Sequence, residues 1–144
     1  MANIKHLLFG RYRYADTGLV ILRVGMGIMF ILHGYPKLFG GTAVWVDIGA
    51  KGMGSFSPEQ YYVFWGFLAA ISEFGGGLLL IPGLFFRVAL TFLFLTMVFA
   101  TGFHVITGQG SPYHAMEAGI LFFSLLWIGP GKYSLDTKLF EGNS

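Results

Sequence analysis

The feature that most constrains this chain is one apolar stretch from Asp16 to Gly41, DTGLVILRVGMGIMFILHGYPKLFGG, which carries Arg23 inside it. A helix that crosses the ~30 Å hydrocarbon core of a bilayer needs ~20 apolar residues. A cation inside such a helix costs from about 2.5 to more than ~10 kcal/mol unless a neighbouring helix relieves it. The stretch therefore predicts a membrane helix, and Arg23 predicts a second helix that carries an acid.

The composition extends this prediction to the whole chain. Its 144 residues are 55% hydrophobic and only 11% charged, whereas soluble domains have about 25% charged residues. We therefore expect an all-α integral membrane four-helix bundle, with spans at about 17–38, 61–81, 88–106 and 112–128, forming a single membrane domain over residues 1–144. The longest connection, 39–59, is rich in glycine and predicts a loop with one short interfacial helix.

The distribution of charge and the lack of cysteine exclude several function classes. Lysine and arginine are scattered rather than clustered, so nucleic acid is not an expected partner. The absence of cysteine excludes thiol chemistry within this chain. One side of the bundle receives Lys5, Arg11, Arg13, Arg87, Lys132 and Lys138, and the other receives only Lys37 and Lys51. The positive-inside rule then predicts that both termini are cytoplasmic.

A first polar layer is expected on the cytoplasmic side of the bundle. Arg23 lies roughly 10 Å inside the first span, and Glu73 lies roughly 12 Å inside the antiparallel second span. We therefore predict an Arg23–Glu73 ion pair, with Glu117 as the alternative partner of Arg23. Such a pair is either purely structural or includes a protonatable Glu73 in a cofactor pocket.

A second polar layer is expected near the outer interface, where His33, His104, His114 and Glu117 end up at similar depth, with Lys37 beside them. Histidine and glutamate could exchange protons with the headgroup of a quinone-like ligand. Three imidazoles and a carboxylate also suit zinc or iron. They come from three helices without a close-spaced motif, so we predict no metal site. Glu117 is the expected proton carrier, because apolar residues flank it on both sides.

The order of several residues resembles the DoxX family of small four-helix membrane proteins, from about Gly18 to Asp136. The resemblance rests on Arg23, Gly27, Gly34, Lys37, Leu38, Phe39, Glu73, Gly77, Leu80, Gly83, Arg87, Ala89, Glu117 and Gly119. It implies a bundle in the bacterial inner membrane. The family is named after a subunit associated with quinone-linked sulfur oxidation, and other members are linked to redox stress or assembly. It implies no catalytic residues that can be assigned to this chain.

We therefore expect a redox-associated subunit that binds a quinone-like hydrophobic ligand or acts with an oxidoreductase partner. The expected catalytic residues are Glu117 and Glu73, and the expected ligand-binding residues are Arg23, His33, Lys37, His104 and His114. The alternatives are a non-enzymatic scaffold or assembly partner, and a small-solute carrier, which the lack of an internal repeat disfavours. The expected partners are the lipid bilayer and either a membrane redox protein or a second copy of the chain.

Overall fold

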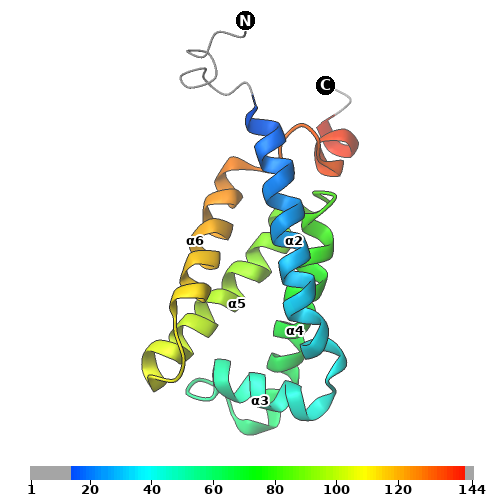
Figure 1. The fold of residues 1–144 in the computed structure, drawn as a ribbon. Helices are drawn as coiled ribbons and strands as arrows, with labels where there is room; N and C mark the ends of the chain where they lie inside the picture. Colours follow the sequence, from blue (N-terminus) through cyan, green and yellow to red (C-terminus); the bar gives the residue numbers. More distant parts are fainter. Residues whose placement is uncertain (1–13, 142–144) are drawn as a thin grey trace, which may run out of the picture.

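The computed structural model describes residues 14–141, and this part of the chain is helical without strands. The elements are α2 Ala15–Phe39, α3 Thr42–Met53, the 3-10 helix η1 Glu59–Tyr61, α4 Tyr62–Leu80, α5 Phe86–Thr107, α6 Tyr113–Ile128 and the π-helix η2 Thr137–Glu141 (Figure 1). Lys5, Arg11 and Arg13 lie outside the described residues. The cytoplasmic placement of the termini therefore stays a prediction.

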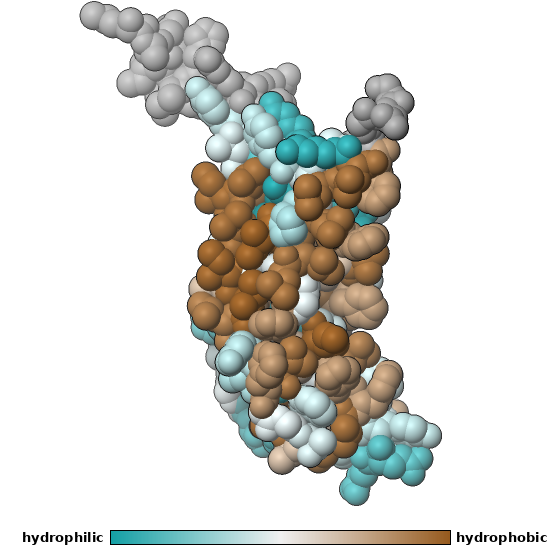
Figure 2. Space-filling model, turned by 90° about the vertical axis from the view of Figure 1, so that its right-hand side faces the viewer, coloured by the Kyte–Doolittle hydropathy of each residue, from teal (hydrophilic) through white to brown (hydrophobic). Residues whose placement is uncertain are grey.

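Three helical segments are long and apolar enough to cross a membrane: 15–39, 59–80 and 86–107. The fourth, α6, is also apolar but has 16 residues. Hydrophobic side chains form a broad band along the molecule, and hydrophilic residues gather toward its two ends (Figure 2). Helices satisfy their own backbone hydrogen bonds, which lipid cannot do for them. The expected all-α membrane bundle is confirmed.

The long helices form a bundle in which α4 packs against both α2 and α5, and α6 packs against α5. Figure 1 shows that the start of α2 and the η2 helix lie at the same end, here called the terminal end. The helix α3 crosses the opposite end, here called the α3 end, and packs mainly on α4. The glycine-rich connection thus contains the short helix expected there, and this helix closes one end of the bundle.

Glycines set how closely the helices approach and which residues face each other. A Cβ atom at Gly27 would lie 2.8 Å from the carbonyl oxygen of Gly77, and one at Gly77 would lie 2.7 Å from that of Gly27. Further along the same interface, a Cβ atom at Gly34 would clash with the backbone nitrogen of Phe74. Small residues permit such backbone contact in membrane bundles. They fix the register between α2 and α4.

The buried apolar core joins the long helices α2, α4, α5 and α6. Phe30 and Phe122 meet edge to face with ring centroids 4.8 Å apart, and aromatic pairs prefer this geometry. Phe86, Leu90 and Leu93 are fully buried and belong to the first half of α5, which starts at the terminal end. The interior is therefore tightly filled in this half of the bundle.

The segment after α6 folds back over the terminal end and closes it. The carboxylate of Asp136 accepts hydrogen bonds from the backbone nitrogens of Phe85 and Phe86, each at 2.8 Å. The backbone nitrogens of Leu135 and Asp136 donate to the carbonyls of Pro82 and Gly83, each at 3.0 Å. Asp136 thus satisfies backbone donors at the start of α5, where a negative charge is also favourable.

Candidate functional site

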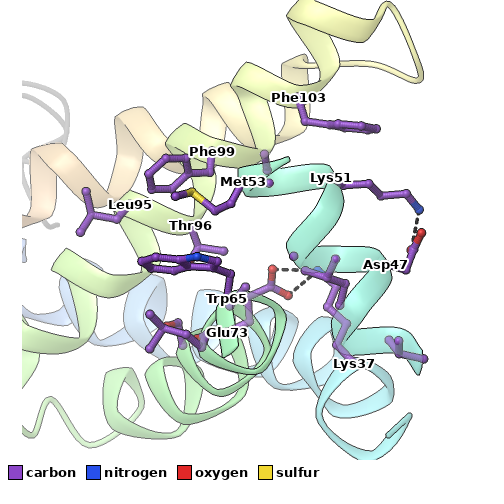
Figure 3. Close-up of a pocket in the computed structure, with 18 of the residues that line it drawn as sticks. Lys37, Asp47, Lys51, Met53, Trp65, Glu73, Leu95, Thr96, Phe99 and Phe103 are labelled. Atoms are coloured by element: carbon purple, nitrogen blue, oxygen red, sulfur yellow. Dashed lines mark hydrogen bonds and ion pairs between the residues drawn. The ribbon is translucent and has the colours of Figure 1, made fainter. Parts of the chain in front are cut away.

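A cavity of about 650 Å³ lies at the α3 end between α3, α4 and α5, and we call it the α3 pocket (Figure 3). Its walls are mostly apolar, and they include Trp65 from α4 and Phe99 and Phe103 from α5. The other lining residues are Lys37, Val44, Asp47, Ile48, Gly49, Lys51, Gly52, Met53, Leu68, Ala69, Ser72, Glu73, Phe92, Leu95, Thr96, Ala100, His104, Gln109 and Gly110.

An ion pair between Lys37 and Glu73 lies on one side of the α3 pocket. Nζ of Lys37 is 2.7 Å from Oε1 and 2.6 Å from Oε2 of Glu73, so it donates to both oxygens (Figure 3). The Glu73 side chain is only 4% exposed, whereas that of Lys37 is 34% exposed. A carboxylate buried to this degree needs a countercharge and hydrogen bonds, and Lys37 supplies both.

The local sequence explains how these two side chains meet. Lys37 lies in the last turn of α2, where a cation interacts favourably with the helix dipole. Its backbone carbonyl accepts a 2.9 Å hydrogen bond from Nε1 of Trp45, which ties the start of α3 to the end of α2. The contact of Gly34 with the backbone of Phe74 brings the neighbouring Glu73 within reach of Lys37.

Polar groups also line the rim of the α3 pocket. Lys51 donates to Asp47 at 2.6 Å on the exposed face of α3. Nδ1 of His104 lies 2.5 Å from the carbonyl oxygen of Gln109 in the turn after α5. The pocket thus combines a mostly apolar lining with a few polar groups, a combination that is typical of sites for small ligands.

The predicted Arg23–Glu73 ion pair is wrong. Arg23 is 2% exposed, its Nη2 donates to the carbonyl of Tyr133 at 3.2 Å, and it interacts electrostatically with Asp136. Within the described part of the chain, its Nε and Nη1 have no hydrogen-bond partner. The glycine contacts explain the error, because their register places Arg23 opposite Gly83 rather than Glu73.

The predicted burial of Glu117 is also wrong. Its side chain is 77% exposed, and that of His114, 4.0 Å away, is 96% exposed. On either side of Glu117, α6 buries Ala115 and Gly119. Glu117 lies two residues from each of them, which corresponds to roughly 200° around a helix. Glu117 therefore points away from the bundle interior.

The predicted layer of outer histidines is not assembled into one cluster. His33 is exposed, and its Nδ1 lies 3.1 Å from the carbonyl of Met29 on its own helix. His104 borders the α3 pocket, whereas His114 lies outside it. No three His, Asp or Glu side chains within residues 14–141 lie close enough together to hold a metal ion.

The α3 pocket thus combines three of the predicted site residues, Lys37, Glu73 and His104, and excludes Arg23, His33, His114 and Glu117. Sequence reasoning missed Trp65 and Asp47 as pocket residues. Small residues in the sequence could have indicated where α3 contacts α4 on this side of the pocket. Gly49 contacts the carbonyl of Tyr62 and Gly66 contacts that of Trp45, so two small residues dock α3 on α4.

The fold and the pocket define a small, multi-pass helical membrane protein with a mostly apolar cavity between its helices. The DoxX family model matches residues 18–107, which contain most of α2, all of α3 to α5 and almost the whole α3 pocket, so the chain belongs to the DoxX family.

Two curated relatives are similar to the chain over most of its length. The chain is 31% identical over 140 residues to an uncharacterized protein of Haemophilus influenzae, covering 90% of this chain and 96% of the relative. It is 28% identical over 131 residues to the inner membrane protein YqjF of Escherichia coli, covering 86% and 93%. No solved structure matches the chain significantly. Together with the membrane-spanning helices, the comparisons make it a multi-pass protein of the bacterial inner membrane.

Proposed function

We propose that the protein binds a quinone-like ligand in the α3 pocket and serves as the membrane subunit of an oxidoreductase. The observation that carries this proposal is a cavity of about 650 Å³ with mostly apolar walls and a charged pair, Lys37–Glu73, whose carboxylate is buried. Sites for small ligands typically measure about 300–1,000 Å³ and combine an apolar lining with a few convergent polar groups. A quinone has matching chemistry, with an apolar ring and carbonyl oxygens.

The charged pair has the chemistry that a quinone headgroup needs. A lysine ammonium has three hydrogens, and the two oxygens of Glu73 engage two of them. The third can donate to a ligand carbonyl. Glu73 can hold or release a proton beside that carbonyl, and His104 at the rim can exchange protons with water. When bound, a quinone supplies two-electron, two-proton carrier chemistry, and the partner oxidoreductase would supply the electrons.

Glu73→Gln is expected to weaken binding of a decyl-substituted benzoquinone by about tenfold, or about 1.4 kcal/mol. The amide no longer holds the lysine ammonium by charge, and Lys37 is exposed enough to turn toward water. Trp65 in the pocket wall allows binding to be measured by fluorescence quenching of the purified protein in mild detergent.

Glu117→Gln is the matched control, because the same chemical change is made at an exposed residue that does not line the α3 pocket. Its affinity should equal that of the unmodified protein. Loss of binding in Glu117→Gln with retention in Glu73→Gln would reject the α3 pocket as the site. Absence of quenching in the unmodified protein would reject quinone binding itself.

A second function, as a scaffold for another membrane protein, is favoured by the outer face of α6. Glu117 and His114 are highly exposed there, and Ile120, Phe123 and Trp127 are exposed beside them. A carboxylate on the outer face of an apolar membrane helix is costly without a partner. Glu117→Leu is expected to lose a stoichiometric membrane partner in mild-detergent copurification, while Glu73→Gln retains it. Equal recovery from both variants would argue against this role for α6.

A further inference from the structure

A second cavity of about 250 Å³ lies next to the α3 pocket, between α4 and α5. Leu68, Ser72 and Phe92 line both cavities, so the two are adjacent. The remaining residues of the second cavity are Ile71, Gly75, Gly76, Leu79, Val88 and Ala89. The one hydroxyl in this wall, on Ser72, already donates to the carbonyl of Leu68. The second cavity therefore offers apolar surface alone.

The two cavities together follow α4 from Trp65 to Leu79, which corresponds to about 21 Å at the rise of an α-helix. This length is about two-thirds of the ~30 Å hydrocarbon core. The groove is also open at the side, because Ile71 is 42% and Val88 54% exposed on the surface of the bundle. A hydrophobic chain could therefore enter laterally from the bilayer.

Of the three consecutive glycines on α4, residues 75–77, close helix packing requires only two. A Cβ atom at Gly77 would lie 2.7 Å from the carbonyl of Gly27, and one at Gly76 would lie 2.8 Å from the Leu93 side chain. A Cβ atom at Gly75 would meet only Ile71, at 3.9 Å. Helix packing thus requires Gly77 and Gly76 but not Gly75. The absent side chain at Gly75 leaves the second cavity open.

We propose that the second cavity binds the hydrocarbon tail of the ligand whose polar head occupies the α3 pocket, and we call it the tail cavity. This inference rests on the proposed function and adds the chemical class of the ligand: a lipophilic molecule with a compact polar head and one extended chain. The head lies beside Lys37 and Glu73, and the chain runs between α4 and α5 toward the terminal end.

The test compares two ligands and two variants by tryptophan quenching of the full-length protein in mild detergent. The ligands share one benzoquinone ring, and only one carries a decyl tail. Gly75→Leu fills the tail cavity. Gly25→Leu is the matched control, since a Cβ atom at Gly25 would have no neighbour within 4 Å and Gly25 lines neither cavity.

We expect Gly75→Leu to weaken binding of the decyl ligand about tenfold, equivalent to about 1.4 kcal/mol. The tailless ring should bind Gly75→Leu and Gly25→Leu as it binds the unmodified protein.

The outcomes separate this inference from the function on which it rests. If both ligands quench the fluorescence and the affinity for the decyl ligand is unchanged in Gly75→Leu, the tail cavity is rejected. Binding of the head in the α3 pocket is then still supported. No quenching of the unmodified protein by either ligand overturns the proposed function and the tail cavity with it. If Gly75→Leu does not fold, Val88→Phe fills the same cavity from α5, and an unchanged decyl affinity in that variant is equally decisive against the proposal.

Discussion

Replacing Lys37 with methionine is expected to destabilise the protein by about 3–5 kcal/mol, the cost of leaving a buried charge without its partner. Glu73 is 4% exposed and receives both of its side-chain hydrogen bonds from Lys37. Methionine keeps most of the length of the lysine side chain but supplies neither charge nor donor. The loss should appear as a lower free energy of unfolding, measured by circular dichroism during denaturation of the protein in mixed micelles.

The double variant Lys37→Met with Glu73→Leu should recover most of that stability, because an apolar pair can replace a buried ion pair at little cost. It should still fail to bind the decyl benzoquinone, since it has lost both polar groups. Recovery of stability without recovery of binding would show that the Lys37–Glu73 pair serves ligand binding and not only stability. A double variant that is no more stable than Lys37→Met would show that the cost does not come from an unpaired Glu73.

The membrane helices could be predicted because hydropathy is a local property. A run of apolar residues long enough to cross the bilayer must become a helix in lipid, whatever its neighbours are. The residues that enter the bundle interior depend instead on helix rotation. Apolar neighbours on both sides of Glu117 indicate depth in the membrane but not direction, and the structure buries Ala115 and Gly119 in its place.

The register between the helices could not be obtained from the predicted ends of the spans either. The predicted depths of Arg23 and Glu73 are counted from these ends, which assumes that both ends lie at the same depth in the membrane. The glycine contacts shift the helices so that Arg23 reaches Gly83, beyond the end of α4, and Lys37 reaches Glu73. Pairing glycines between the two spans would have suggested this shift. The partner of Arg23 would have stayed hidden, because Tyr133 is distant in the sequence.

The α3 pocket was the least predictable feature because it depends on where a connecting helix docks. The sequence predicts one short interfacial helix in the connection 39–59, but it does not predict the surface on which this helix docks. The structure shows that a hydrogen bond from Trp45 to the Lys37 carbonyl holds one end of α3. Backbone contacts through Gly49 and Gly66 hold its side against α4.

This docking makes Gly66→Ala the smallest change expected to open the α3 pocket. A Cβ atom at Gly66 would clash with the carbonyl of Trp45, and backbone cannot move aside as a side chain can. We expect α3 to be displaced, at a cost of about 1–3 kcal/mol typical of overpacking. Hydrogen exchange of the amides in 42–53 should accelerate while those of α4 stay protected, because local opening needs less free energy than global unfolding.

Gly102→Ala is the matched control for this prediction, because nothing lies within 4 Å of the added methyl group and Gly102 does not line the pocket. Exchange in 42–53 should be the same in Gly102→Ala as in the unmodified protein. Because α3 forms one wall of the pocket, Gly66→Ala should also weaken binding of the tailless quinone ring, which depends on the α3 pocket alone. Unchanged exchange in Gly66→Ala would mean that α3 is not held by this contact. Faster exchange with full retention of ring binding would mean that α3 is not a wall of the ligand site.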